Sequence, residues 1–368
     1  MNNRSRLLTA VLVGIALLWT VQGVFAGGSA EKSSPSSTPT KTGAPAQSTT
    51  PAQKPITFRI STTSVPSDWH TKALYVFKDY IDKHLPGQFD IQIYASSSLI
   101  PADAEFGALE QNNIQMAYVS AQTLAQNGFT QVLPLTAGYV VKSPAELCSL
   151  WYSQLGQQWA SAISQKFGFH VMGEAYLGTR QLDLRFTRPI MTPADLAGVK
   201  LRMPPAPAWI FLGKALGANP TPLAFSELYL GLQTGTIDGQ DNPLPTDQAA
   251  KFYEVTKQIV MTNHLVDGII VMTNNQTWNS LTPEQQKVMQ EASLELIKYN
   301  NVNRIKDEAN LVAFFKSKGL EITYPDLNAF RTHVLDAYLH SDQSKDWPPN
   351  IIQTLDAIPQ APQCNFGS

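Results

Sequence analysis

An arginine ends a short apolar run near the middle of the chain. The stretch Gly198–Met203 alternates like a β-strand and places Arg202 between two apolar neighbours, and two prolines then end the pattern. A guanidinium stays protonated at working pH and offers five donors in a planar fork. Burying such a charge at the end of a strand requires an anion. That anion is either an internal Asp or Glu or the carboxylate of a bound solute.

The motifs of common enzymes are missing from the sequence. There is no G-x-S-x-G, H-E-x-x-H, G-x-x-x-x-G-K-[ST], G-x-G-x-x-G or C-x-x-C, so no standard nucleophile, zinc or nucleotide site is indicated. The six histidines are scattered, and His70 and His84 stand fourteen residues apart on one predicted helix, where we expect both to be surface groups. We therefore expect no enzyme activity, no metal site and no cofactor.

Composition narrows the class of protein further. The 368 residues carry a formal net charge of −2, and only 15% of them are charged. A near-neutral chain of this kind lacks the basic surface of a nucleic-acid-binding protein. Its length and its 43% apolar content suggest about two domains with a sizeable core.

The N-terminus has the pattern of an export signal. A basic segment is followed by the apolar run 7–21 and by Val24-Phe25-Ala26, which is typical of a cleaved signal peptide. Residues 27–55 lack aromatic and large aliphatic residues and are predicted to be a disordered Ser/Thr/Pro-rich spacer. We expect a periplasmic protein with a signal peptide over 1–26; an uncleaved segment would leave it tethered to the membrane.

The only two cysteines are Cys148 and Cys364. In an oxidising compartment they are expected either to form a disulfide that fixes the C-terminal tail, 359–368, or to remain separate. In the second case Cys148 is a small buried hydrophobe in a helix.

The folded region begins near Ile56 with alternating strands and helices. Strands are predicted at 56–61, 89–94, 114–119, 169–177, 181–187, 257–262 and 267–273. Helices are predicted at 70–85, 101–112, 143–167, 209–216, 226–234 and 282–317. The βαβαβ opening implies a mostly parallel sheet covered by helices, and the last helix, opened by a Thr282–Gln285 capping box, is long enough to brace two lobes.

The block from Gly198 to Tyr253, with the residues next to it, carries a family resemblance. The sequences GVKLR, GANPTP, AFSE, IDGQDNP and KFYEV occur there in that order, followed by WNSLTPEQQKVMQEAS and preceded by GTR. In this order they resemble the DctP-type extracytoplasmic solute-binding proteins of tripartite ATP-independent periplasmic (TRAP) transporters. The resemblance covers nearly the whole region after Ile56.

The resemblance implies an α/β, two-lobed fold like that of periplasmic binding proteins, with a long bracing helix. Lobe I would contain residues 56–177 and about 268–307, and lobe II residues 178–267 and about 308–358. A solute would bind between the lobes, which close over it.

The resemblance also implies roles for individual residues. Arg202 matches the family arginine that forms a bidentate salt bridge with the solute carboxylate, and a planar fork suits that anion. The other matched or nearby pocket candidates are Arg180, Asn242, Asp241, Phe225, Glu105, Trp209 and Trp69. Asp241 stands where the family usually has glutamate, and Arg185 and Arg188 compete with Arg180 because the segment after it is longer than usual.

The resulting hypothesis is a receptor that delivers an organic acid to TRAP permease subunits for uptake driven by an ion gradient. The receptor is expected to be a monomer that binds no nucleic acid. Two alternatives remain open: a solute-sensing protein of a signalling system, and a receptor for an apolar acid or lipid. The sequence does not name the solute.

Overall fold

The structure is a computed structural model that describes residues 54–366. The predicted signal peptide and all but the last two residues of the predicted spacer lie outside these residues. In the part of the chain that is described, no helix is both long and apolar enough to cross a membrane.

Nine strands of the described region form one sheet in the order β2-β1-β3-β8-β4-β7-β5-β6, and β9 pairs with β8. β8 runs antiparallel to its two neighbours, β3 and β4. β1 is parallel to β2 and to β3. β5 is parallel to β6 and to β7. The strands are β1 Ile56–Ser61, β2 Phe89–Tyr94, β3 Met116–Ser120, β4 Phe169–Leu184, β5 Lys200–Met203, β6 Asn219–Pro222, β7 Gly239–Pro243, β8 Gln258–Asn274 and β9 Glu321–Thr323.

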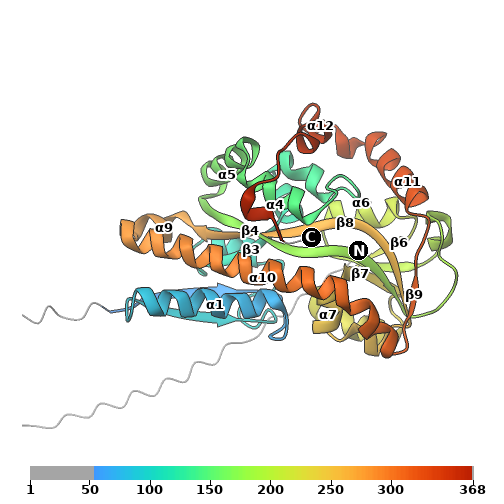
Figure 1. The fold of residues 1–368 in the computed structure, drawn as a ribbon, viewed down its shortest axis with the longest axis horizontal. Helices are drawn as coiled ribbons and strands as arrows, with labels where there is room; N and C mark the ends of the chain where they lie inside the picture. The colour runs from blue at the N-terminus through green and yellow to red at the C-terminus, as the bar shows by residue number, and fades with distance from the viewer. Residues whose placement is uncertain (1–53, 367–368) are drawn as a thin grey trace, which may run out of the picture. The chain divides into compact units, whose positions relative to one another are not determined.

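Helices lie on both faces of this sheet. They are α1 Trp69–His84, α2 Glu105–Glu110, α3 Ala121–Gln126, α4 Pro144–Tyr152, α5 Gln154–Phe167, α6 Pro207–Ala215, α7 Phe225–Thr234, α8 Leu244–Ala249, α9 Asn275–Ser280, α10 Pro283–Ser317, α11 Leu327–Leu339 and α12 Ile351–Asp356. Within residues 54–366, α1 and α10 lie on one side of the sheet and α4, α5, α11 and α12 on the other (Figure 1).

Two long strands join the two parts of the sheet. β3 pairs with β8 only over Ile269–Thr273, and β7 pairs with β4 only over Arg180–Leu184. Between them, β4 and β8 pair with each other across irregular registers around Gly178. The predicted lobe boundaries, 177/178 and 267/268, fall at this place, and we use "lobe I" and "lobe II" for the predicted halves. The division itself stays a prediction.

The sequence suggested four separate strands here, and this was wrong. β4 and β8 are continuous, because register shifts absorb the glycines and polar residues that looked like strand ends. Gly178, for example, has φ +133°, and a Cβ built on it would lie 2.3 Å from Cβ of Pro243. Only glycine fits at this close approach of β4 and β7.

Helix α10 is confirmed as the long brace. The Thr282 side chain accepts from the Gln285 amide, the Gln285 side chain accepts from the Thr282 amide, and Pro283 opens the first turn. This capping box satisfies donors that a helix start leaves unpaired. α10 packs on α1 and β4 in lobe I and on α8 and β9 in lobe II, so it runs along both.

The helix predicted over 143–167 is divided in two. The Ser153 hydroxyl accepts from the Gly156 amide at 3.2 Å and caps α5, immediately after the end of α4. A Cβ on Gly156 would lie 2.2 Å from the Leu150 carbonyl, so the tight corner requires glycine. The helix predicted over 101–112 is likewise shorter, Glu105–Glu110, and β6, β7 and α8 were missed because prolines interrupt their patterns.

The two cysteines form a disulfide. Cys148 on α4 is bonded to Cys364 near the C-terminus, with their Cα atoms 5.7 Å apart. The sequence left open whether the two cysteines are bonded or separate, and the structure shows that they are bonded. The C-terminal tail is held on α4.

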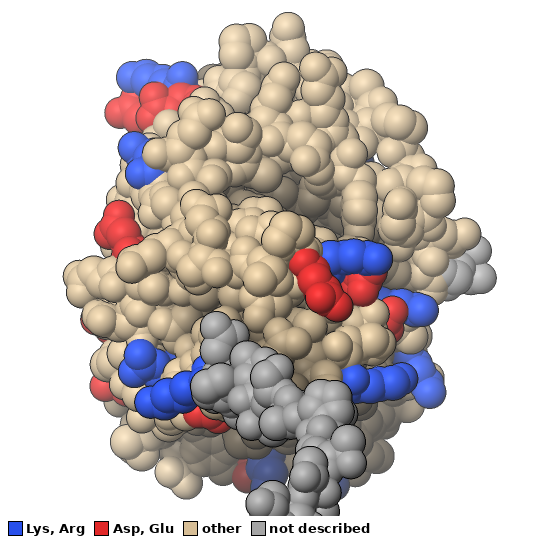
Figure 2. Space-filling model, turned by 90° about the vertical axis from the view of Figure 1, so that its left-hand side faces the viewer, with Lys and Arg blue, Asp and Glu red and all other residues tan. Residues whose placement is uncertain are grey.

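Charged side chains are sparse on the face shown in Figure 2, where lysines and arginines lie near acidic residues around a large uncharged area. This distribution agrees with a chain of near-zero net charge, and no large patch of one sign is visible on this face.

Candidate functional site

Arg202 is a buried guanidinium that forms no ion pair within residues 54–366. It lies on β5 between the core residues Leu201 and Met203 and is 2% exposed. Its Nε donates to the Leu223 carbonyl at 2.8 Å, and it makes no ion pair with any described residue. Burial, only partly offset by nearby Asp241, lowers the pKa of Arg202 to about 10. This low pKa marks a charge whose counter-ion is incomplete.

Arg180 has, by contrast, an internal set of partners. Its Nε donates to Asp267 Oδ2 at 2.7 Å, and its Nη1 donates to the Asp241 carbonyl at 2.8 Å and to Asn242 Oδ1 at 3.2 Å. Burial opposes the charge, but Asp241 and Asp267 outweigh it and raise the pKa of Arg180. The Trp209 ring covers the guanidinium, with its centroid 4.3 Å from Cζ.

Strand β7 brings the polar groups of lobe II together. Its register places Gln240 opposite Arg202 on β5 and Asn242 opposite Gln181 on β4. The Asn242 amide donates to Gln240 Oε1 at 2.5 Å. The structure therefore gathers Arg202, Arg180, Asp241 and Asn242 around adjacent strands.

Asp241 also connects to a histidine that the sequence did not single out. His264 Nε2 lies 3.3 Å from Asp241 Oδ2, and both side chains are fully buried. Asp241 Oδ1 has no hydrogen-bond partner in the described structure. Asp267 was missed as well, because nothing in the sequence shows that an aspartate inside β8 faces Arg180.

Glu105 lies at the carboxyl end of the parallel strands of lobe I. It begins α2, is 8% exposed, and accepts a hydrogen bond from Ser61 at the end of β1, with Oγ and Oε1 2.6 Å apart. Burial raises the pKa of Glu105 to about 7, against a smaller lowering by Ser61. Crevices at the carboxyl ends of strands are where α/β sheets bind ligands.

The three predicted aromatic residues have different surroundings. Trp209 is buried beneath Arg180. Phe225 begins α7, is half-buried, and packs edge-on against Phe252 with ring centroids 5.7 Å apart. Trp69 contacts α10 instead, donating from Nε1 to Asp307 at 2.5 Å and packing edge-on against Tyr299. The hydrogen bond and ring contacts of Trp69 therefore involve α10 and Lys72 rather than Arg180 or Arg202.

The competing arginines lie away from the cluster. Arg188 is exposed, and its Nη2 donates to the Asp195 carbonyl. Arg185 is half-buried and lies close to Gly235. Arg180 and Arg202 are thus the buried arginines of lobe II.

A second buried arginine cluster lies where α10 meets lobe I. Arg304 is fully buried and pairs with Asp68, and its Nη1 donates to the Leu177 carbonyl at 2.6 Å. His70 Nδ1 lies 3.0 Å from Arg304 Nη2, and burial lowers the pKa of His70. The prediction that His70 is a surface group was wrong, because α1 packs that side of its first turn against α10.

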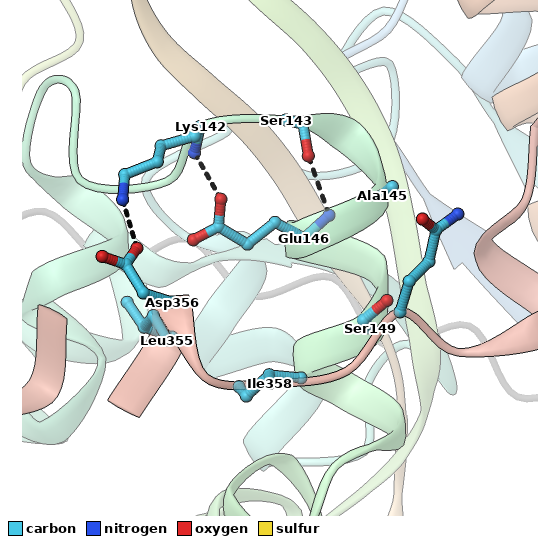
Figure 3. A pocket seen from close by; sticks show the side chains of 9 residues that line it. Lys142, Ser143, Ala145, Glu146, Ser149, Leu355, Asp356 and Ile358 are labelled. Carbon is cyan, nitrogen blue, oxygen red and sulfur yellow. Dashed lines mark hydrogen bonds and ion pairs between the residues drawn. The ribbon is translucent and has the colours of Figure 1, made fainter. Parts of the chain in front are cut away.

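The two described cavities lie elsewhere. One, of about 450 Å³, lies between α4 and the C-terminal segment (Figure 3), and the other, of about 430 Å³, is lined mainly by Pro205, Pro207 and Phe211 beside α6. No group of three or more His, Cys, Asp or Glu among residues 54–366 is arranged to hold a metal ion.

Comparison with known proteins decides the family. The model of the bacterial extracellular solute-binding protein family 7 (DctP) matches residues 60–344. The chain belongs to this family. The DctP family match confirms the resemblance stated above and identifies a TRAP-type solute-binding protein, not an enzyme.

The relatives of this DctP-family protein include proteins whose names or structures give a solute. The sialic acid-binding periplasmic protein SiaP of Vibrio cholerae is 33% identical over 76% of this chain and 86% of its own length. A TRAP periplasmic solute-binding protein of Roseobacter denitrificans, solved with 3-deoxy-D-manno-oct-2-ulosonic acid (KDO), is 39% identical with a TM-score of 0.80, covering 83% of this chain and 100% of its own. A second one from that organism, solved with L-galactonate, is 26% identical with a TM-score of 0.75, covering 83% and 99%.

These similarities confirm the two-lobed α/β fold with its long helix α10. They also confirm the expected location, because the relatives are periplasmic binding proteins.

Proposed function

We propose that this DctP-family protein captures a polyhydroxylated organic acid between its lobes and delivers it to TRAP permease subunits. The observation that carries the proposal is Arg202, a buried guanidinium that forms no ion pair with a described residue and whose burial Asp241 offsets only in part. A solute carboxylate would accept its remaining fork of donors, and charge-assisted bonds of this kind are about twice as strong as neutral ones.

Arg180 and Asn242 would hold this carboxylate from the side. Arg180 Nη2 makes no hydrogen bond within residues 54–366, whereas its Nε and Nη1 are held by Asp267, Asp241 and Asn242. The internal partners would fix the orientation of Arg180 and leave one edge of its guanidinium for the solute. Asp241 would act as a positioning residue, because it contacts Arg180 and His264 rather than the site itself.

Glu105 would bind the polar part of the solute from lobe I. With a pKa of about 7, this carboxyl is protonated in a good fraction of molecules at neutral pH and can then donate to a hydroxyl group. The named solutes of the relatives, sialic acid, KDO and L-galactonate, each combine one carboxylate with several hydroxyls. The sugar acids are therefore the class we propose. Closure follows from the higher affinity of the solute for the state in which both lobes contact it.

The test is a thermal-shift panel on protein freed of bound ligand by unfolding and refolding. The panel contains KDO, N-acetylneuraminate, L-galactonate and succinate, and a ligand that binds only folded protein raises its melting temperature. We expect a sugar acid to stabilise the wild type and Arg202→Ala to lose this effect, since removing one partner of a buried ion pair costs about 2–5 kcal/mol. Arg188→Ala, at an exposed arginine of the same lobe, is the matched control. Equal stabilisation of wild type and Arg202→Ala by the same acid would contradict the proposal.

A further inference from the structure

The last part of the chain extends past the region that defines the family. The family model ends at residue 344, whereas the structure continues to 366 through α12 and a 3-10 turn at Pro362–Cys364. Residues 340–366, which we call the strap, follow α11 directly. Each end of the strap is attached to a different part of the sheet.

The first end is attached to lobe II. α11 packs on α6, and the Tyr338 ring at the end of α11 meets Phe211 of α6 at 4.7 Å between centroids. Trp347 of the strap then packs on Tyr338 at 6.0 Å. The Tyr338 hydroxyl also donates to the Thr136 carbonyl of lobe I at 3.4 Å, and residues 342–344 of the strap lie against 130–136. The strap up to Trp347 is therefore anchored on α11 and α6 of lobe II, at a place where α11 also touches lobe I.

The second end is attached to lobe I through α4. α12 packs on α4, Cys364 is bonded to Cys148, and the Ala361 amide donates to Ser149 Oγ at 3.0 Å. Figure 3 shows Lys142, just before α4, pairing with Asp356 at the end of α12. α4 is in turn fixed on α5, where the Trp151 and Trp159 rings meet at 6.3 Å.

The connection between the two ends is short and stiff. Only Pro348, Pro349 and Asn350 separate Trp347 from Ile351, the first residue of α12. Four residue steps span about 14 Å when fully extended, and consecutive prolines form a semi-rigid spacer. Ile351 and Leu355 are buried. The strap therefore has little slack to follow a separation of the lobes.

We propose that residues 340–366 are a strap, locked by the Cys148–Cys364 disulfide, that restrains the opening of the two lobes. The main chain passes between the predicted lobes at 177/178, 267/268 and within α10, and the disulfide adds a covalent link on the opposite side of the sheet from α10 (Figure 1). Opening then has to pull Trp347 from Tyr338 or α12 from α4. A disulfide persists in the oxidising periplasm, so the restraint is permanent there. The proposal rests on the receptor mechanism only in requiring lobes that open.

One backbone hydrogen bond reports the opening directly. The Tyr139 amide, in lobe I, donates to the His264 carbonyl, in lobe II, at 2.9 Å. Its hydrogen exchange requires this contact to break. The Phe58 amide lies in β1, inside the sheet of lobe I, and serves as the internal reference.

The experiment compares ligand-free wild type with Cys148→Ser/Cys364→Ser by small-angle scattering and by hydrogen exchange over seconds to minutes. We expect a larger radius of gyration and roughly tenfold faster exchange at Tyr139 in the variant, with Phe58 protected in both proteins. Trp347→Ala, which keeps the disulfide and removes the other anchor, should have the same effect. Lys345→Ala, at an exposed lysine of the strap, should behave as wild type.

Unchanged exchange at Tyr139 in both anchor variants would overturn the proposal. So would acceleration of Phe58 along with Tyr139 in both, because this indicates a general loss of stability. These measurements use no ligand, so a failure to bind any sugar acid would leave them interpretable and would count against the proposed function alone.

Discussion

Removing the charge of Arg202 should leave the ligand-free protein as stable as before, or more so. The guanidinium is buried and has no carboxylate partner among residues 54–366. A buried charge whose counter-ion is a ligand lowers the stability of the folded protein as long as the ligand is absent. Arg202→Met keeps the length and apolar body of the side chain and removes that charge.

The magnitude follows from the pKa. Its fall from 12.5 to about 10 corresponds to about 3 kcal/mol of unfavourable charge burial, since one pKa unit equals about 1.4 kcal/mol. Against this stands the hydrogen bond from Nε to the Leu223 carbonyl, whose loss costs about 1–3 kcal/mol if the carbonyl stays buried. The balance favours Arg202→Met by about 0–2 kcal/mol.

Urea unfolding of ligand-free, oxidised protein measures this balance, with Arg180→Met alongside. Arg180→Met leaves Asp267 and Asp241 buried without their cation, which costs about 3–5 kcal/mol. The account thus predicts opposite outcomes for two arginines on neighbouring parts of one sheet. A loss of about 3 kcal/mol or more in Arg202→Met would refute it, because Arg202 would then serve the fold.

Two further predictions concern Glu105 and Gly178. Burial raises the pKa of Glu105 from 4.5 to about 7, so the folded protein holds a proton that the unfolded chain releases; stability should fall by up to about 3 kcal/mol as pH rises from 4.5 to 7. Glu105→Gln should remove this part of the pH dependence in urea unfolding, and an unchanged slope would speak against a buried carboxyl. Gly178→Ala, with its Cβ 2.3 Å from Pro243 Cβ at φ +133°, should cost about 1–3 kcal/mol. Gly107→Ala, with no atom within 4 Å, should be neutral or slightly stabilising; a similar loss in both would disprove the steric argument.

The sequence predicted correctly those helices and strands that are marked by local signals, such as capping residues and hydrophobic spacing. The Thr282–Gln285 capping box and the three-to-four spacing after it predicted α10 correctly. The βαβαβ opening predicted β1, α1 and β2 to within a residue or two. Cys148 and Cys364 could be counted but not paired, because their 216-residue separation depends on the whole fold.

Long-range pairing is what the sequence could not show. β4 and β8 looked like four strands because their register shifts resemble strand ends. The family resemblance singled out Arg202 and Asn242, which lie on the paired strands β5 and β7. Asp267 and His264 gave no local sign that they face Arg180 and Asp241. His70 looked exposed because its partner Arg304 lies 234 residues away on α10.

The most direct test of the central claim is a double-mutant cycle between Arg202 and the solute carboxylate. The affinities of KDO and of its neutral methyl ester would be measured by calorimetry for wild type and for Arg202→Ala. We predict that the ester binds wild type at least about 30-fold more weakly than the acid, which corresponds to about 2 kcal/mol of binding free energy. We also predict that Arg202→Ala binds the acid and the ester equally weakly. An acid preference of the same size in Arg202→Ala would show that another group holds the carboxylate.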